Sequence, residues 1–309
     1  MTNKKWIKNF FLNIIILIFI IEINYQLNSS SNRHYVDYII NNILPNTKNK
    51  NVDILILGDS VAANAFKNKI LKENIFDLSS NQAISMAGNY FLLKRFLEQN
   101  NPPKELFLFT IPQFYQNDLN QIWTYLYFET VFQNDEEFEE IKKIKPNLYL
   151  SENKLDKYFE TRKNKFIFKN ENENFNNRKQ HHFVEISDLD NSQNYLSHNV
   201  TLKEREFVKI YNLTPEIPMI YLNKLQKLCQ EKNIKLNIVI EPSPHRILNL
   251  FYLSNWYKYL KNMNIGFYDI NEFYKFSDIH FHDGVHISGK INDYYLQLVD
   301  ENIFSVIKR

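Results

Sequence analysis

The segment Val52–Ser60, with the sequence VDILILGDS, decides the fold of this chain. Its apolar core, Ile54–Leu57, runs directly into the turn residues Gly58 and Asp59. A short run of this kind, rich in β-branched residues, is typical of a strand buried on both faces of a parallel sheet. Apolar residues then recur at near-helical spacing from Val61 to Leu71, which predicts a helix that begins near Ser60.

Ser60 is therefore expected at a junction between a strand and a helix. In open α/β sheets, binding and active sites gather at the carboxyl ends of the strands. The N-terminus of a helix also offers unpaired N–H groups to an anion. Asp59 or Ser60 could equally be an ordinary helix cap in a tight turn. This stretch alone leaves both interpretations open.

The rest of the sheet is predicted from further apolar segments that alternate with helical patterns. The predicted strands are Ile75–Ser79, Leu106–Ile111, Leu236–Ile240 and Phe267–Ile270, the last short enough for a sheet edge. The predicted helices are Pro218–Lys232, Leu248–Met263 and Ile291–Ile307, and a loop over Asn81–Tyr90 opens into a further helix that continues through Phe91–Leu97. This alternation predicts an α/β fold with a central parallel sheet covered on both faces.

Residues 114–211 interrupt the alternation and are interpreted as a helical, partly irregular insertion over the sheet. The insertion contains an acidic run, Asp135–Glu140, which we expect to be a solvent-exposed face. The predicted organisation is thus an anchor within residues 1–30 and one domain over residues 31–309, which includes the insertion.

Composition narrows the function classes. The chain has 37 basic and 35 acidic residues, so its net charge of +2 gives no reason to expect a nucleic-acid partner. The single cysteine, Cys229, excludes an internal disulfide and a cysteine-based metal site. A chain of 309 residues is long enough to bury a large core.

The N-terminus has the layout of an export signal. Lys4, Lys5 and Lys8 precede an apolar run from Phe10 to Ile23, as in a secretory signal or an uncleaved signal anchor. No small-x-small cleavage site follows, which favours a retained transmembrane helix over a removed signal peptide. By the positive-inside rule, the predicted location is a single-pass protein of the cytoplasmic (inner) membrane, with its domain periplasmic or otherwise extracytoplasmic.

A second motif lies near the C-terminus, where Asp283 and His286 stand within one turn of each other before the last predicted helix. Serine, histidine and aspartate together form the constellation used for acyl transfer. The histidine takes the proton of the hydroxyl, and the carboxylate fixes the tautomer of the histidine. Alternatively, Asp283 belongs to a plain turn and His286 caps the helix.

The same region offers a metal hypothesis. His280, His282 and His286 lie close to Asp283 in the sequence, and a His-x-His pair on a strand can hold zinc. A zinc site would leave the strand end at Ser60 without a function.

An apolar strand that ends in Gly58-Asp59-Ser60, together with Asp283-x-x-His286 before the last helix, resembles the SGNH (GDSL-type) hydrolase superfamily. The predicted anchor and the Asp-Gly-Val-His sequence are similar to the envelope branch, which includes proteins of alginate and peptidoglycan O-acetylation and of teichoic-acid D-alanylation. The resemblance implies a flavodoxin-like three-layer sandwich. It also implies that Ser60 is the nucleophile, His286 the base and Asp283 the orienting acid.

The resemblance further implies an oxyanion hole lined by the backbone N–H groups of Ser60 and Gly88. The superfamily's Gly-x-Asn-Asp block is missing after the third strand, where Thr110–Phe114 stands instead. Asn89 and Gln113 are the remaining candidates for a side-chain donor.

The implied function is that of a serine-dependent acyl esterase or O-acyltransferase, with acetyl as the default acyl group. Its substrate would be an acyl ester of a cell-envelope or extracellular polysaccharide, and its partner an integral-membrane acyl donor. The resemblance implies no cofactor. The alternative is a catalytically weak or inactive subunit that serves as an anchored partner or glycan-binding component of a modification machine.

Overall fold

The computed structural model describes residues 7, 9–16, 18–19, 36, 39–48, 51–66, 74–119, 124–146, 148, 215–281, 285–287 and 289–305. The chain divides into two compact units, Met1–His34 with Leu150–Lys179, and Tyr35–Tyr149 with Gln180–Arg309. The sheet and the candidate site belong to the second unit, which is described here by itself.

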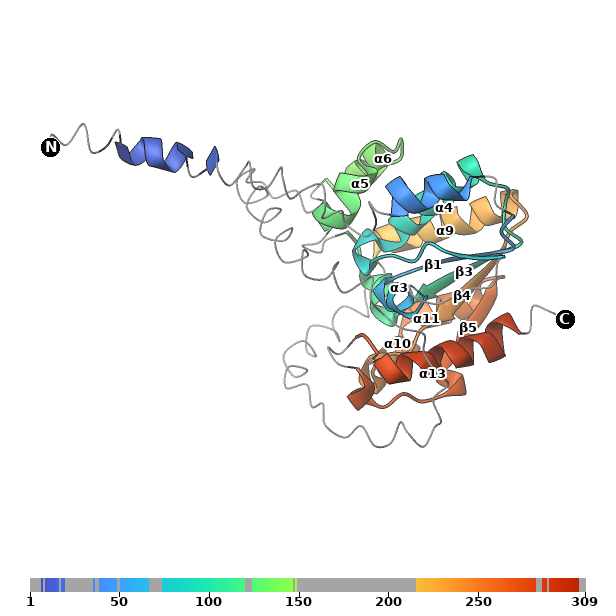
Figure 1. The fold of residues 1–309 in the computed structure, drawn as a ribbon. Coiled ribbons are helices and arrows are strands. Elements are labelled where there is room, and N and C mark those ends of the chain that lie inside the picture. The colour runs from blue at the N-terminus through green and yellow to red at the C-terminus, as the bar shows by residue number, and fades with distance from the viewer. Residues whose placement is uncertain are drawn as a thin grey trace. The chain divides into compact units, whose positions relative to one another are not determined.

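A five-stranded parallel sheet forms the centre of this unit, in the order β2-β1-β3-β4-β5 (Figure 1). The strands are β1 (Ile54–Gly58), β2 (Ile75–Asp77), β3 (Glu105–Thr110), β4 (Lys235–Ile240) and β5 (Gly266–Asp269). Every residue of β1 is buried, as its unbroken apolar run predicts. The predicted strands and the edge position of β5 are confirmed.

Helices cover both faces of the sheet, which confirms the predicted α/β class (Figure 1). On one face lie α4 (Ser85–Gln99) and α9 (Glu216–Glu231), which pack against each other. On the other lie α3 (Ser60–Phe66), α10 (His245–Leu253), α11 (Asn255–Asn262) and α13 (Gly289–Val299). The 3₁₀ helix η3 (Gln82–Ile84) leads into α4, and the helices η1 (Ile39–Ile43) and η2 (Leu44–Thr47) precede β1.

Aromatic side chains fill the space between the layers. Phe109 on β3 packs edge-on against Phe66 of α3 on one side, with ring centroids 5.0 Å apart. On the opposite face of the sheet, Phe91 of α4 packs edge-on against Tyr221 of α9 at 5.8 Å. Each such ring contributes about 1.5–3 kcal/mol by its burial, so these contacts hold α3 against β3 and α4 against α9.

Two predicted helices are shorter in the structure than in the sequence pattern. The predicted helix Leu248–Met263 is wrong as a single element, because Ser254 separates α10 from α11 and its Oγ accepts the N–H of Tyr257 as an N-cap. The last helix, α13, ends at Val299 and continues as a π-helical turn, η9 (Asp300–Phe304).

The strand register brings separate parts of the chain to one edge. Gly58 at the end of β1 pairs with Phe109, and Thr110 at the end of β3 pairs with Ile240 at the end of β4. The residues that follow these strands therefore meet at the carboxyl edge. The strand order reverses between β1 and β3, which is where open α/β sheets place their sites.

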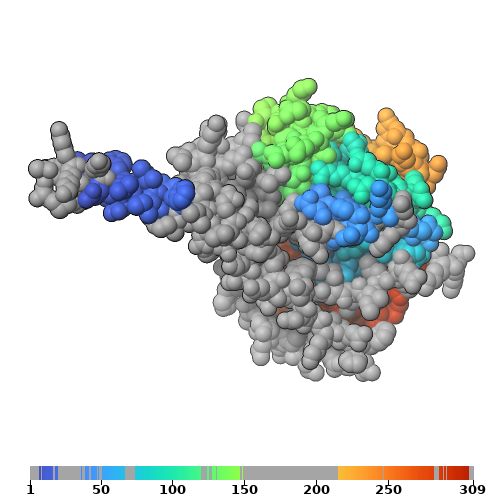
Figure 2. Space-filling view, turned by 45° about the horizontal axis from the view of Figure 1, so that its top comes forward, coloured from blue at the N-terminus to red at the C-terminus, as the bar shows by residue number. Residues whose placement is uncertain are grey.

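The described part of the insertion begins with η4 (Pro112–Gln116) and continues through η5 (Tyr125–Glu129), α5 (Thr130–Phe132) and α6 (Phe138–Ile144). In Figure 2 the segment around α5 and α6 forms a raised, green patch next to α4. Residues 120–123, 147 and 149–211 of the predicted insertion lie outside the described residues.

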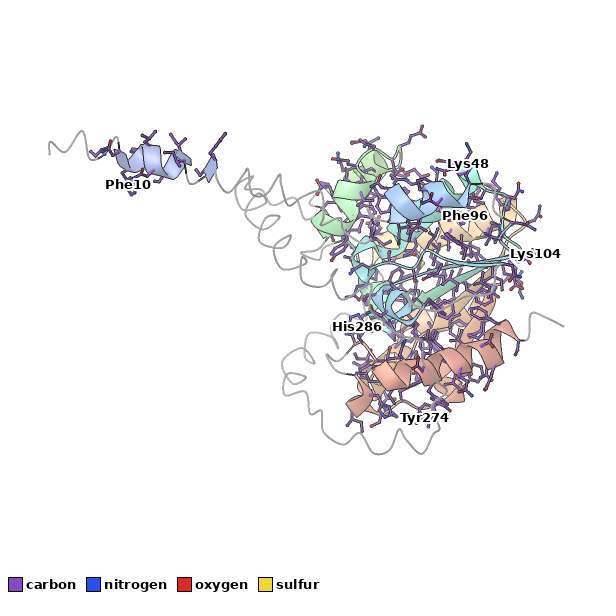
Figure 3. All side chains as sticks on the ribbon, viewed as in Figure 1. Phe10, Lys48, Phe96, Lys104, Tyr274 and His286 are labelled. Carbon is purple, nitrogen blue, oxygen red and sulfur yellow. The ribbon has the colours of Figure 1, made fainter. Side chains whose placement is uncertain are left out.

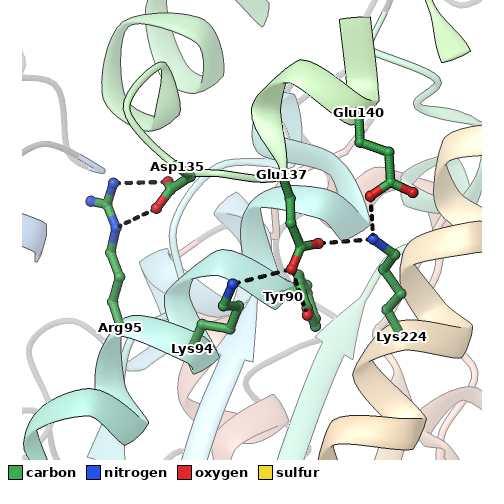
Figure 4. A network of polar contacts seen from close by, with 7 residues as sticks. All are labelled: Tyr90, Lys94, Arg95, Asp135, Glu137, Glu140 and Lys224. Carbon is green, nitrogen blue, oxygen red and sulfur yellow. Dashed lines mark hydrogen bonds and ion pairs between the residues drawn. The ribbon is translucent and has the colours of Figure 1, made fainter. Parts of the chain in front are cut away.

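The acidic run Asp135–Glu140 is not simply a solvated face, which corrects the sequence-based expectation. The carboxylate of Glu137 accepts hydrogen bonds from Tyr90 at 2.9 Å, Lys94 at 3.1 Å and Lys224 at 2.9 Å (Figure 4). Figure 4 also shows the ion pairs Arg95–Asp135 and Lys224–Glu140. The run thus ties the start of the insertion to both α4 and α9.

The described residues of the predicted anchor, 7, 9–16 and 18–19, are helical, and their large apolar side chains are exposed. None of the helices in the described part of the chain has the length and apolar character needed to cross a membrane. The remainder of the predicted anchor, residues 1–30, lies outside the described residues.

Candidate functional site

Ser60 is the first residue of α3 and follows β1 by one residue, as the sequence predicts. This tight junction depends on Gly58. A Cβ atom at Gly58 would lie 2.6 Å from the carbonyl oxygen of Phe109 and 2.9 Å from Cβ of Ala62. Glycine therefore lets β1 approach β3 closely while the chain turns into the helix.

Asp59 holds the junction in place. Its side chain is fully buried, and its two oxygens accept the N–H of Val61 and the N–H of Ile111, each at 2.8 Å. The first bond caps α3, and the second ties the junction to the chain just beyond β3. Asp59, rather than Ser60, therefore caps α3. The hydroxyl of Ser60 instead contacts His286.

The hydroxyl of Ser60 contacts His286. Ser60 Oγ and His286 Nε2 are 2.8 Å apart, although the two residues are separated by 226 positions. Both side chains are partly exposed. His286 precedes Ile287, which forms an antiparallel bridge with Phe281. Figure 3 labels His286 beside α3, at the opposite end of the sheet from Lys104, which precedes β3.

Asp283 lies outside the described residues, so its proposed contact with His286 stays a prediction. The same holds for His282 of the zinc hypothesis. Within the residues that the structure describes, no three His, Cys, Asp or Glu side chains are grouped so that they could hold a metal ion. His280 is buried in the 3₁₀ helix η8 (Asp278–His280) and lies edge-on to Phe276.

The predicted oxyanion residues Gly88 and Asn89 lie in the first turns of α4. Gly88 is its fourth residue, where the helical ladder begins to take up the N–H groups. Ile84 packs so closely that a Cβ at Gly88 would meet its side chain at 2.4 Å. Asn89 Nδ2 donates to the carbonyl oxygen of Ser85 at 3.1 Å. The assignment of both residues to an oxyanion hole therefore rests on the sequence alone.

The turn Thr110–Tyr115 after β3 is closed by a hydrogen bond between its two ends. The SGNH resemblance leads us to expect a Gly-x-Asn-Asp block at this place. The hydroxyl groups of Thr110 and Tyr115 are hydrogen-bonded at 2.8 Å and buried. Burial raises the pKa of Tyr115. Gln113 Oε1 is buried with no hydrogen-bond partner among the described residues.

Glu241 is a residue that sequence reasoning missed. It directly follows β4, is fully buried, and its Oε1 accepts the hydroxyl of Tyr295 at 3.0 Å. Burial and the carboxylate of Asp59 raise the pKa of Glu241 well above its ordinary value. The available signal is a charged residue that directly follows the apolar, buried run Ile238–Ile240 at the end of β4.

Burial also raises the pKa of Asp59, although hydrogen bonds from Ile111, Glu241 and Val61 and the charge of His286 act in the opposite direction.

Comparison with protein-family models, curated proteins and solved structures gave no match to this chain.

Proposed function

We propose that this chain is a serine-dependent acyl esterase or O-acyltransferase that acts on O-acyl groups of a cell-envelope or extracellular polysaccharide. The contact of 2.8 Å between Ser60 Oγ and His286 Nε2 carries this proposal. A serine hydroxyl becomes a useful nucleophile when an imidazole lies within hydrogen-bond distance to take its proton. The position of Ser60 at the carboxyl edge, where β1 gives way to α3, suits an acyl carbonyl approaching from solvent.

The chemistry follows from these two side chains. Ser60 Oγ attacks the ester carbonyl carbon while its proton passes to His286 Nε2. The tetrahedral intermediate then expels the sugar oxygen, which takes that proton, and an acyl-enzyme remains. Water or a second sugar hydroxyl attacks the acyl carbon with His286 again as base, and Ser60 is released. Asp283 would fix the tautomer of His286. Hydrolysis and transfer share the first half of this sequence.

The fold class also supports the proposal, although it does not identify a reaction. The strand order 2-1-3-4-5 is the flavodoxin-like order, which agrees with the three-layer sandwich implied by the SGNH resemblance. The polysaccharide substrate, the membrane acyl donor and the anchored, extracytoplasmic location rest on that resemblance and on the N-terminal sequence.

Hydrolysis of a small aryl acetate tests the proposal. We expect Ser60→Ala and His286→Gln each to remove most of the acetate release, because the members of such a unit act together. The exposed residues Ser277 and His245 offer matched controls, and Ser277→Ala and His245→Gln should leave the rate unchanged. Full activity in folded Ser60→Ala would refute the proposed nucleophile.

An inactive, anchored subunit is the second candidate, and the closed Thr110–Tyr115 turn in place of the Gly-x-Asn-Asp block favours it. A missing oxyanion donor costs about 10²–10³-fold in rate. Cells that carry Ser60→Ala distinguish the two candidates. Normal polysaccharide acylation with Ser60→Ala, but loss on deletion of the whole chain, would favour the subunit. Loss in both cases would favour the enzyme.

A further inference from the structure

We propose that Asn117 is a positioning residue that joins the two loops beside Ser60 and holds them at a fixed spacing. The loops are residues 78–85, between β2 and the start of α4, and residues 111–119, which follow β3 and include η4. The effect of this link on the reaction rests on the proposed function. The link itself does not, and it is tested separately below.

Both loops are attached to the junction that carries Ser60. On the β2 side, the N–H of Ser80 donates to the carbonyl oxygen of Gly58 at 3.0 Å. On the β3 side, the N–H of Ile111 donates to the carboxylate of Asp59 at 2.8 Å. Because β2 and β3 are the two neighbours of β1 in the sheet, the loops flank this junction from opposite sides. Their spacing therefore affects the room in which an acyl ester approaches the hydroxyl of Ser60.

Asn117 connects the two loops through both its side chain and its main chain. Its Nδ2 donates to the carbonyl oxygen of Gln82, and its own carbonyl oxygen accepts the hydroxyl of Ser85 at 2.5 Å. Within its own loop, Oδ1 of Asn117 accepts the N–H of Leu119 at 3.1 Å. The side chain of Asn117 is buried, so water does not compete for these bonds.

Two of the residues bonded to Asn117 have a left-handed backbone, although neither is glycine. The φ angle is 58° at Ser85 and 58° at Leu119, and both side chains are fully buried. The ψ angle of Ser85, −172°, brings it close to a region that is essentially restricted to glycine. Such conformations persist only where surrounding contacts impose them, and they cluster at functional sites. Asn117 is hydrogen-bonded to both residues, which indicates that it maintains this geometry.

The consequence for the proposed reaction is geometric. A misplacement of about 1 Å in an active site can lower a rate by about 10²-fold. Loss of the bond from Asn117 to Gln82 frees the loop after β2 from the loop after β3, so the two sides of the Ser60 junction are no longer held together. Asn117 thus acts through the loops and not by contact with the ester.

Hydrogen exchange of the full chain, followed by mass spectrometry, tests the link without an assay of activity. Asn117→Asp keeps the oxygen that accepts the N–H of Leu119 but removes the donor to Gln82. We expect residues 78–85 to exchange about tenfold faster in this variant, which corresponds to the loss of one hydrogen bond. Equal exchange of this loop in Asn117→Asp and the wild type would overturn the inference.

Asn100→Asp is the matched control for this experiment. Asn100 is the C-cap residue of α4, and its Nδ2 donates to the carbonyl oxygen of Phe96 at 3.0 Å. The substitution therefore removes a buried amide donor at the other end of the same helix. It should leave the exchange of residues 78–85 unchanged, and acceleration equal to that in Asn117→Asp would contradict a specific link.

Substitutions of Ser85 test the backbone conformation. Ser85→Gly and Ser85→Ala both remove the hydroxyl, but only glycine adopts a positive φ without strain. Ser85→Gly should therefore melt at a higher temperature than Ser85→Ala. At Ser243, a buried serine without a positive φ, the order should be reversed. A lower melting temperature for Ser85→Gly than for Ser85→Ala would contradict the strained turn.

The positioning role needs kcat for an aryl acetate, measured far enough below the melting temperature of each variant that all molecules are folded. Asn117→Asp should lower kcat by about 10²-fold, whereas Asn100→Asp should leave it unchanged. A normal kcat in Asn117→Asp, together with faster exchange, would show a purely structural role and contradict the positioning role. If the wild type has no activity, the proposed function fails and the positioning role fails with it, while the exchange result still decides the link.

Discussion

Ser60 Oγ lies 2.8 Å from His286 Nε2, and the contact joins the start of α3, directly after β1, to a segment close to the C-terminus. Two sets of local contacts position these side chains. Asp59 fixes the turn before Ser60, and the bridge between Phe281 and Ile287 holds the segment that carries His286. Substitutions that disrupt either set of contacts should reduce the proposed esterase activity even when Ser60 and His286 are intact.

Gly58→Ala is expected to destabilise the fold by about 1–3 kcal/mol, the usual cost of overpacking a well-packed site. The added methyl group would meet the carbonyl oxygen of Phe109 at 2.6 Å, and this backbone atom cannot easily move. Urea titration measures the loss. Gly289→Ala is the control, because a Cβ there meets nothing within 4 Å and alanine favours the helix it begins. Equal stability of Gly58→Ala and the wild type would contradict the close approach of β1 and β3.

Glu137→Gln should destabilise the protein at neutral pH by about 1–3 kcal/mol, since it leaves Lys94 and Lys224 without their shared carboxylate. Burial raises the pKa of Glu137, but hydrogen bonds from Lys224, Lys94 and Tyr90 outweigh it and lower the pKa overall. The stabilisation is therefore present above the unfolded pKa and is lost as the pH falls through the folded one.

Denaturation as a function of pH measures this effect. The difference between the wild type and Glu137→Gln should shrink on acidification. Glu139→Gln, at an exposed residue paired with Lys142, should cost little at any pH. A difference between wild type and Glu137→Gln that does not depend on pH would show that the charge of Glu137 is not responsible.

Asp77→Asn should stabilise the protein at pH 8. Burial raises the pKa of Asp77 to about 7, even though the N–H and hydroxyl of Ser79 both donate to it at 2.8 and 2.5 Å. Because the folded pKa is the higher one, the wild type loses stability as the pH rises from about 4 to about 7. Thermal unfolding across this range should show the loss in the wild type and not in Asp77→Asn. A parallel decline in both proteins would assign it to another group.

Asp283→Asn should lower kcat by about 10³–10⁴-fold if Asp283 orients His286, since such a change favours the wrong tautomer. The comparison requires a variant whose far-UV circular dichroism matches that of the wild type. Steady-state hydrolysis of an aryl acetate provides the measurement. The exposed residue Asp278, which accepts the N–H of His245, offers the control Asp278→Asn. A near-normal rate in Asp283→Asn would show that Asp283 does not orient His286.

Much of the fold could be predicted because its signals are local. The buried run Ile54–Leu57, the turn at Gly58 and the helical spacing after Ser60 lie within a single stretch, and the structure confirms the strand, the turn and the helix as far as Phe66. Ser254 shows where such patterns mislead. Apolar spacing continues through it, but its side chain caps a new helix instead of extending the old one.

The features that the sequence does not predict depend on contacts between distant segments of the chain. Asp59 and Glu241 both come to the carboxyl edge of the sheet because β1, β3 and β4 are in register, which no local pattern reveals. Likewise, the acidic residue Glu137 looks like surface until α4 and α9 bring their lysines to it. A local sequence pattern does not reveal these ion pairs, because the lysine partners of Glu137 are far away along the chain.

Covalent trapping identifies the nucleophile without any assumption about the substrate. The folded chain is treated with a fluorophosphonate probe, and intact mass and peptide mapping locate the adduct. We predict one adduct on Ser60, absent in Ser60→Ala, strongly reduced in His286→Gln and unchanged in Ser277→Ala. An adduct on another serine, or no adduct on a chain shown to be folded, would contradict the assignment of Ser60 and His286 as a nucleophile and its base.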